Sequence, residues 1–250
     1  FAPDGKSVYF ISDEPLQVKP QEFKTLRFHD PDSGRFEVLS AAIPGDVGGF
    51  GIADDGRHLA YVSNEDGISR LRVLALPSHK EIKLPELPIG VIGGLAFSPD
   101  GGRLALTINS ATSPSDAYVV DLAAASLTRW TRSEVGGLDA STFVAPTLVR
   151  YPTFDKVDGV RRTIPAFFYK PAKRSGTPAS KTGKYPVVIN IHGGPESQSL
   201  PTFNATAQYL ANELGVAMLV PNVRGSSGYG KTWLSLDNAE KREDSVKDIG

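Results

Sequence analysis

One short motif, present three times, most limits the folds open to this 250-residue chain. Each copy places an Asp-Gly pair ahead of alternating apolar residues, and the Asp residues fall at positions 4, 55 and 100, at intervals of 51 and 45 residues. Asp bonds its own backbone in reversing turns, and Gly tolerates the positive φ that such turns need. The motif therefore predicts a tight turn followed by a half-buried strand in each repeat. The apolar pairs after the turns are Val8/Phe10, Leu59/Tyr61 and Leu104/Leu106.

Each repeat also contains further strand-like runs, so its length and strand content match one blade of a β-propeller. Four strands in ~45 residues are typical of such a blade, and about 4–8 blades close a ring. Three repeats therefore predict a partial propeller. A β-sandwich with unrelated Asp-Gly hairpins is the alternative, but an apolar residue also recurs before each turn. The further runs are 25–28 and 35–39, then 70–76 and 81–84, then 117–122 and 127–131.

After residue 133 the pattern changes to strands that alternate with a helix. The stretch 162–170 is typical of a strand, and 185–192 is a continuous apolar run of the kind found in buried parallel sheets. The polar stretch 173–184 between them predicts an exposed loop. Apolar residues at helical spacing follow over 203–214, and another strand is expected over 216–220.

This order of elements predicts an α/β sheet in a second domain. The expected fold is therefore mixed. We expect residues 1–145 to form a partial β-propeller with three blade-like repeats, and residues 146–250 to form the α/β domain.

The composition excludes several classes of function. With 27 Lys and Arg against 28 Asp and Glu, the formal net charge is −1, which argues against nucleic-acid binding. No apolar run approaches the ~18 residues of a membrane span. The absence of cysteine excludes disulfides, a thiol nucleophile and Cys-ligated zinc. His29, His58 and His79 lie in the repeats, in no metal-ligand pattern, and we expect them to be solvated strand or turn residues.

The segment His192-Gly193-Gly194-Pro195 comes at the end of the predicted strand 185–192. Ligands of α/β sheets bind beyond the carboxyl ends of the strands, and two glycines there let backbone N–H groups approach a substrate. In α/β-hydrolases a loop at this place supplies one donor of the oxyanion hole. A Gly-Gly-Pro turn with an incidental His is the alternative. His192 is not expected to be the general base, because in this fold the base follows the nucleophile along the chain.

A second motif competes with the first. Gly225–Thr232 matches G-x-x-x-x-G-K-[ST], which alone would predict an NTPase with Lys231 at the phosphates and Thr232 at Mg²⁺. However, the segment 221–224 separates the preceding strand from the first glycine, whereas a P-loop starts where its strand ends. No apolar strand ending in a magnesium-binding Asp follows. The NTPase is therefore a remote alternative.

Together these segments resemble the prolyl oligopeptidase family of serine peptidases, on the acylaminoacyl-peptidase and dipeptidyl-peptidase side. The resemblance extends over essentially all 250 residues, from the F-x-P-D-G repeats to the two hydrolase-domain motifs, 186–195 and 221–230, in that order. It implies a propeller followed by the N-terminal part of an α/β-hydrolase domain. It also implies that the apparent P-loop is a family loop that binds no nucleotide.

The resemblance implies a peptidase that hydrolyses short peptides by acyl transfer, with no metal or organic cofactor. Carried over to this chain, Gly194 is the expected oxyanion donor, His192 and Gly193 belong to the same loop, and Arg224 is expected to support the loop. A non-catalytic propeller that acts as a binding module is the alternative. Family members occur in the cytoplasm and in the bacterial periplasm, so compartment and oligomeric state stay open.

The catalytic Ser, Asp and His that the resemblance implies are absent from this sequence. No G-x-S-x-G elbow occurs, and the pair Ser226-Ser227 has the wrong spacing for one. Phe1 falls inside a repeat, and Gly250 falls inside the hydrolase part. We therefore expect a fragment that is inactive on its own, with the catalytic Ser a little beyond Gly250.

Overall fold

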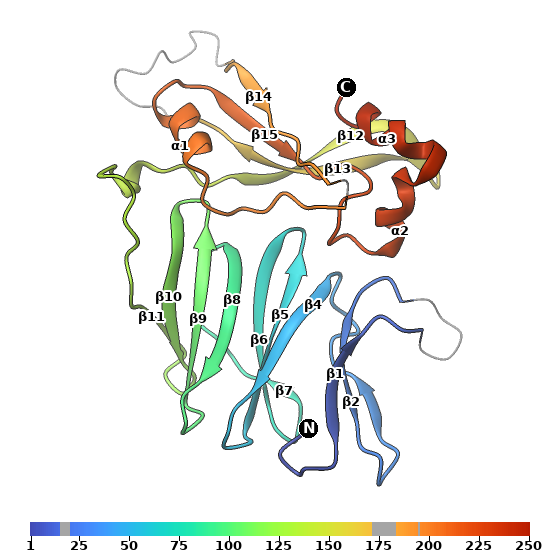
Figure 1. Ribbon diagram of the computed structural model, residues 1–250, viewed down its shortest axis with the longest axis vertical. Helices are drawn as coiled ribbons and strands as arrows, with labels where there is room; N and C mark the ends of the chain where they lie inside the picture. The colour runs from blue at the N-terminus through green and yellow to red at the C-terminus, as the bar shows by residue number, and fades with distance from the viewer. Residues whose placement is uncertain (16–20, 172–183, 195) are drawn as a thin grey trace. The chain divides into compact units, whose positions relative to one another are not determined.

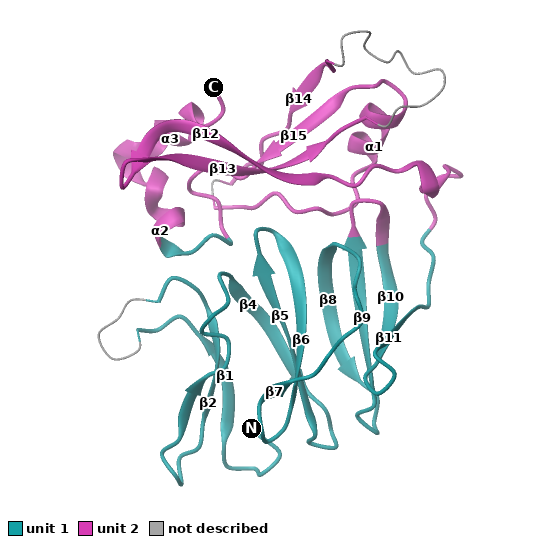
Figure 2. Cartoon of the chain, turned by 180° about the vertical axis from the view of Figure 1, so that it is seen from behind, with its two compact units in different colours: residues 1–109, 115–133, 228–231 teal, residues 110–114, 134–227, 232–250 magenta. Residues whose placement is uncertain are grey.

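The computed structural model describes residues 1–15, 21–171, 184–194 and 196–250 (Figure 1). Nearly all of the predicted loop 173–184 lies outside the described residues, as does Pro195. The chain divides into two compact units (Figure 2). The first contains residues 1–109, 115–133 and 228–231, and the second contains 110–114, 134–227 and 232–250. The domain boundary between residues 145 and 146 stays a prediction.

The first unit contains three sheets, in each of which neighbouring strands follow chain order. Every strand run expected within the repeats overlaps one of these strands, although the run 81–84 shares only Glu81 with β7. The first sheet has β1 (Val8–Ser12), β2 (Thr25–His29) and β3 (Phe36–Val38). The second has β4 (Asp46–Ile52), β5 (His58–Glu65), β6 (Ile68–Ala75) and β7 (Lys80–Glu81). The third has β8 (Gly90–Phe97), β9 (Arg103–Ser110), β10 (Ser113–Asp121) and β11 (Ser126–Arg129).

The three Asp-Gly turns share one pattern of backbone hydrogen bonds. In each turn the Gly N–H donates to the carbonyl three positions earlier, and that earlier residue donates its own N–H to the carbonyl two positions after the Gly. Gly5, Gly56 and Gly101 have φ of +71°, +72° and +67°, a region that residues with a side chain rarely adopt. The repeated sequence motif is therefore also a repeat of backbone geometry.

Two hydrophobic clusters join neighbouring sheets of this unit. The side chains of Leu59 and Tyr61 enter one cluster, and that of Ala60, between them on β5, enters the other. Because successive strand residues point to opposite faces, both faces of the middle sheet are covered. The first cluster contains Ala2, Tyr9, Leu26, Phe28, Val47, Leu59, Tyr61 and Leu74. The second contains Ala60, Leu71, Val73, Leu104, Leu106, Ile108, Tyr118, Val120 and Leu122.

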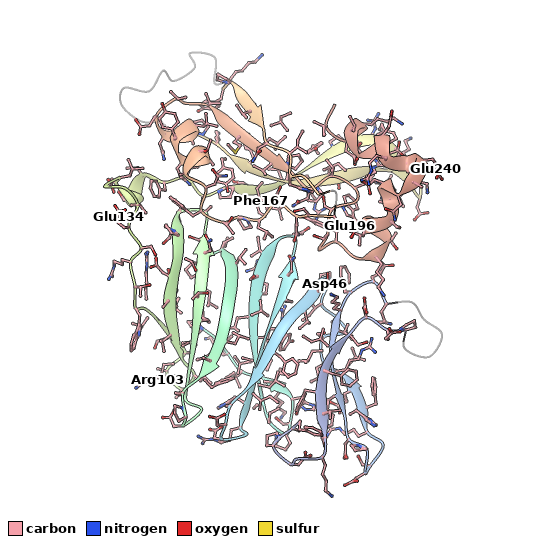
Figure 3. The ribbon with its side chains drawn as sticks, viewed as in Figure 1. Asp46, Arg103, Glu134, Phe167, Glu196 and Glu240 are labelled. Atoms are coloured by element: carbon pink, nitrogen blue, oxygen red, sulfur yellow. The ribbon has the colours of Figure 1, made fainter. Side chains whose placement is uncertain are left out.

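The second unit is built on one mixed sheet in the order β12-β13-β15-β14. The strands are β12 (Thr147–Val157), β13 (Val160–Tyr169), β14 (Val187–Ile189) and β15 (Ala217–Pro221). β13 is antiparallel to β12 and β15, whereas β14 is parallel to β15. Phe167, near the C-terminal end of β13, is buried (Figure 3). The predicted α/β sheet is thus present.

Helix α1 (Ala205–Asn212) connects β14 to β15, as the helical spacing predicted. Its first turn is capped by Asn204, whose Oδ1 accepts the N–H of Ala207 at 2.9 Å. Gly215, with φ of +63°, follows the helix end. The other helices are short: η1 (Ala140–Thr142), α2 (Lys231–Leu234), η2 (Ser235–Asp237), η3 (Ala239–Lys241) and α3 (Arg242–Lys247). None of the described helices is long and apolar enough to cross a membrane.

The prediction that 185–192 forms a buried strand is wrong in its burial. Val187, Val188 and Ile189 of β14 are 53%, 42% and 44% exposed. β14 is an edge strand with β15 on one side, and within the described residues no second layer covers its apolar side chains. The apolar run therefore predicted the parallel pairing with β15 correctly and the burial of the strand wrongly.

Candidate functional site

The His-Gly-Gly segment follows the carboxyl end of β14. The N–H of Asn190 donates to the carbonyl of Leu219 at 2.9 Å, so the pairing with β15 extends one residue beyond the strand. His192 is then half-buried, and both Gly193 and Gly194 are exposed. The loop thus leaves a parallel strand with its glycine backbone open to solvent, which is the placement expected of a ligand-binding loop.

The two glycines of this loop differ in how strictly they require glycine. Gly194 has φ of +145°, and an added Cβ would lie 2.9 Å from the N of Glu196 and 3.1 Å from the Cβ of Ser197. At Gly193 an added Cβ would meet nothing within 4 Å. Glu196 lies in the segment just after the loop (Figure 3). Gly194 is therefore the position where backbone conformation excludes other residues.

The imidazole of His192 donates a hydrogen bond to a buried serine. The hydroxyl of Ser226, which has no exposed surface, lies 2.6 Å from the carbonyl oxygen of Val223. Because a hydroxyl has one proton and a carbonyl only accepts, Ser226 gives its proton to Val223 and accepts from His192 Nε2 at 2.9 Å. His192 Nε2 therefore carries a proton. The pair is not a nucleophile with its general base.

Two further contacts hold the segment after the glycines. The fully buried side chain of Asn222 accepts the N–H of Ser199 at 2.6 Å and donates to the carbonyl of Ser199 at 3.0 Å. The N–H of Ser227 donates to the carbonyl of Ser197 at 3.0 Å. Together with Ser226, these residues fasten the His-Gly-Gly loop and its continuation to the segment that follows β15. The sequence motif around residue 225 is thus a structural support for the loop.

Arg224, the predicted support of the loop, contacts other residues. Its guanidinium is 3% exposed and forms a double hydrogen bond with Asp248, from Nε to Oδ2 and from Nη2 to Oδ1, each at 2.8 Å. Nη2 also donates to Asp155 Oδ1 at 2.8 Å, and the Phe154 ring centroid lies 4.6 Å from Cζ. These contacts join the end of α3 to β12. A role of Arg224 in supporting the loop stays a prediction.

The charges in this network shift each other's titration. Burial raises the pKa of Asp155, but the hydrogen bonds from Arg224 and Arg162 outweigh it and hold the pKa below its ordinary value. Burial lowers the pKa of Arg224, whereas its bonds to Asp248 and Asp155 raise it further above the usual range. Burial, with Asp248 nearby, raises the pKa of Tyr151 to about 12. The pair of Arg224 and Asp155 is therefore fully charged at neutral pH.

The segment Gly225–Thr232 does not present its backbone as a phosphate cradle. Four of its N–H groups already donate to protein carbonyls: Gly225 to Trp233, Ser226 to Val223, Ser227 to Ser197 and Lys231 to Glu22, at 3.0–3.1 Å. The ammonium of Lys231 lies 3.0 Å from the carbonyl of Asp13 and 3.2 Å from its carboxylate. A P-loop needs free N–H groups and a free lysine at the phosphates. This geometry disfavours the NTPase.

Among the described residues, no group of three or more His, Cys, Asp or Glu is arranged to hold a metal ion. The three histidines of the repeats are not all solvated, however. The side chain of His79 is 7% exposed and bonded to Tyr9 and Glu37, so the expectation of a solvated residue is wrong there. The sequence contained no signal for this contact, because the three residues come from different strands and turns.

Several known proteins are similar to this chain in sequence. No protein-family profile matches the chain. The "Uncharacterized peptidase YuxL" of Bacillus subtilis (strain 168) is 27% identical over 144 residues, which are 58% of this chain and 20% of that protein. The acylamino-acid-releasing enzyme of Arabidopsis thaliana is 29% identical over 125 residues, 48% of this chain and 15% of the enzyme. The chain thus spans a fifth or less of these relatives.

Solved structures share the fold over nearly the whole chain. A puromycin hydrolase matches with a TM-score of 0.76 at 19% identity, covering 99% of this chain and 36% of the hydrolase. Prolyl oligopeptidase B from Galerina marginata matches with a TM-score of 0.76 at 16% identity, covering 98% of this chain and 33% of that structure. The curated relatives and structural neighbours are peptidases of the prolyl oligopeptidase family. The resemblance indicated by the sequence motifs is therefore confirmed.

Proposed function

We propose that this chain supplies the oxyanion-hole loop of a serine peptidase of the prolyl oligopeptidase family, which hydrolyses short peptides. The observation that carries the proposal is Gly194. It is exposed, lies just beyond a strand that is parallel to β15, and has a backbone conformation that excludes side chains. The peptidase relatives support the same assignment.

The proposed reaction is acyl transfer. A serine attacks the peptide carbonyl with a histidine as general base, and an aspartate orients the imidazole. In this proposal the three residues lie outside residues 1–250. The oxyanion accepts hydrogen bonds from the Gly194 N–H and from the N–H that follows the serine. The contacts of Asn222, Ser226 and Ser227 hold the loop in place before substrate arrives, so the donor needs no reorganisation during the reaction.

We propose further that the three sheets of the first unit are blades of a β-propeller, with the domains divided at residues 145 and 146. The shared hydrogen-bond pattern of the three turns supports equivalent blades. The relatives, whose family combines a propeller with an α/β-hydrolase domain, support the same reading. No metal or organic cofactor takes part in the proposed reaction.

The test compares the two glycines in a protein that carries this chain together with a catalytic serine. Gly194→Ala should lower kcat/KM by about 100-fold or more, chiefly through kcat, because it displaces an oxyanion donor. Gly193→Ala, with open space for its Cβ, is the matched control and should change kcat/KM only a few-fold. Equal losses in both variants, or none in Gly194→Ala, would refute the assigned donor.

The 250-residue chain alone should not hydrolyse aminoacyl- or peptidyl-p-nitroanilides. Ser226, whose hydroxyl is hydrogen-bonded to His192, is buried and gives its proton to a carbonyl. Turnover that a fluorophosphonate abolishes would show that these residues contain a nucleophile of their own.

A further inference from the structure

The first unit contains a cavity that the proposed peptidase reaction does not use. It has a volume of about 250 Å³ and is formed by the N-terminal turn, β1, β2 and the turn after β6. Apolar walls alternate with a few polar groups, as in small-molecule sites. The walls come from Ala2, Pro3, Phe28, Leu76 and Pro77, and the polar groups from Asp4, Tyr9, Arg35 and His79.

Three rings in the cavity wall pack against one another. The Phe28 centroid lies 4.9 Å from that of His79 and 5.0 Å from that of Tyr9, and the planes are inclined by 65° and 48°. The guanidinium carbon of Arg35 lies 5.3 Å from the Phe28 centroid. A ligand in the cavity therefore meets aromatic edges and faces next to a cation.

A hydrogen-bonded chain fixes the rings. Hydrogen bonds from Arg35 and then His79 lower the pKa of Glu37, which is therefore an ionised acceptor. His79 Nδ1 accordingly carries the proton that Glu37 Oε2 accepts at 2.8 Å, and His79 Nε2 is hydrogen-bonded to the Tyr9 hydroxyl at 2.8 Å. Burial raises the pKa of Tyr9 to about 12, so the phenol stays protonated at neutral pH.

Two carboxylates at or next to the cavity, those of Glu37 and Asp4, accept hydrogen bonds from the protein itself. Both oxygens of Glu37 are engaged, by Arg35 Nε at 2.6 Å and by His79. Both oxygens of Asp4 are engaged too, by the hydroxyl and N–H of Ser7 and the N–H of Lys6. Both carboxylates are thus already paired with donors of the protein itself.

Arg35 can donate further hydrogen bonds to a ligand. Within the described residues its side chain donates through Nε, to Glu37, which leaves the outer edge with both Nη groups for another acceptor. That edge matches the two oxygens of a planar carboxylate, and a bidentate pair of this kind is among the stronger hydrogen-bonded contacts in proteins.

We propose that this cavity binds a small carboxylate carrying an aromatic or alicyclic ring, with the carboxylate on the Nη edge of Arg35 and the ring against Tyr9, Phe28 and the prolines. The volume suits a single ring with a short polar extension. This site is independent of the peptidase assignment, because the peptidase loop and the cavity share no residues.

The test uses two probes of the same size, N-acetyl-L-phenylalanine with a carboxylate and N-acetyl-L-phenylalaninamide with a neutral amide in its place, titrated calorimetrically into the 250-residue chain. The acid should bind at least tenfold more tightly than the amide. Arg35→Gln should weaken binding of the acid at least tenfold and leave the amide unchanged. Arg103→Gln is the matched control, an arginine of the third sheet that is 67% exposed and paired with Asp121, and it should bind the acid as wild type does (Figure 3).

Equal affinity for acid and amide, no saturable binding of either, or undiminished binding of the acid by Arg35→Gln would each overturn the proposal. If circular dichroism shows that Arg35→Gln does not fold, the comparison of the two probes on the wild-type chain decides alone.

Discussion

The hydrogen bonds that define the turns of the first unit and those that hold the second unit span very different distances along the sequence. In the first, each Asp-Gly turn closes through backbone hydrogen bonds within one short segment: 2–7, 53–58 or 98–103. In the second, the decisive contacts join residues far apart: Asn222 with Ser199 across 23 positions, and Arg224 with Asp248 and Asp155 across 24 and 69. Short-range contacts leave a visible motif in the sequence. A long-range contact appears in the sequence only as a single polar residue, and the sequence does not indicate its partner.

Removal of Arg224 should have the largest effect on stability. Arg224→Met leaves Asp248, whose side chain has no exposed surface, without its buried cation, and breaking such a pair costs about 3–5 kcal/mol. Urea unfolding followed by Trp233 fluorescence in a Trp130→Phe background reports on the second unit, because the sequence has only two tryptophans. Arg103→Met, in the exposed pair of the first unit, should change stability by less than about 0.5 kcal/mol, with unfolding of that unit followed by circular dichroism. Similar losses in both would erase the contrast between the units.

Loss of the two hydrogen bonds between the Asn222 side chain and the Ser199 backbone should have the next largest effect on stability. Asn222→Ala leaves a buried N–H and a buried carbonyl without the side chain that pairs them, at a cost of about 2–3 kcal/mol. Asn190→Ala is the control, because the Asn190 side chain is exposed and its backbone N–H stays in place. The same Trp233 assay measures both variants. An equal, small loss of stability in both variants would mean that the hydrogen bonds of Asn222 to Ser199 contribute little to holding the loop.

Turn glycines give a direct comparison of the units. Gly5 and Gly225 both have positive φ, +71° and +86°, but an added Cβ meets nothing at Gly5 and lies 2.1 Å from Asp237 Oδ1 at Gly225. Gly5→Ala should therefore cost only the conformational strain, about 1–2 kcal/mol. Gly225→Ala should cost about 1 kcal/mol more, because Asp237 must move. Thermal unfolding measures both, and equal costs would show that Asp237 yields freely.

Acid pH should weaken the second unit through Asp155, and this effect is the smallest expected because the side chain is 26% exposed. Its folded-state pKa lies below the ordinary 3.8, so its stabilisation is complete above that value and is lost as the pH falls through the folded pKa. Urea titrations from about pH 6 to pH 3 should show this loss. Asp155→Asn should lack it and unfold more easily at neutral pH. An unchanged acid dependence in the variant would assign the titration to other carboxylates.

Residues 1–130 show how much of the structure local pattern can predict. The turns at 5, 56 and 101 and the strands after them follow from Asp-Gly pairs and alternating apolar residues, since both act within a few positions. His79 shows the limit. Nothing in its neighbourhood indicates that a turn residue meets Tyr9 on β1 and Glu37 on β3, because that contact depends on how two sheets pack.

The sequence predicted where the candidate site lies, but it did not predict which residues hold the loop in position. The apolar run before His192 indicated a strand with a glycine loop beyond it, and β14 and the loop are there. The literal P-loop match was misleading, because a spacing rule contains no information on whether N–H groups are free. Arg224 was identified as important, yet its partners Asp155 and Asp248 could not be chosen among 28 acidic residues.

By itself, the sequence determined the repeated turns, the strands of the first unit, the order of strand, loop, helix and strand in the second, and the resemblance to prolyl oligopeptidases. These features depend on the conformational preferences of a few adjacent residues. Only the tertiary structure decided that Gly194 needs its positive φ, that His192 donates to Ser226, that β14 is exposed and that Arg35 borders a cavity. Each of these depends on contacts between residues that are distant in the sequence, and the packing of the folded chain determines which contacts form.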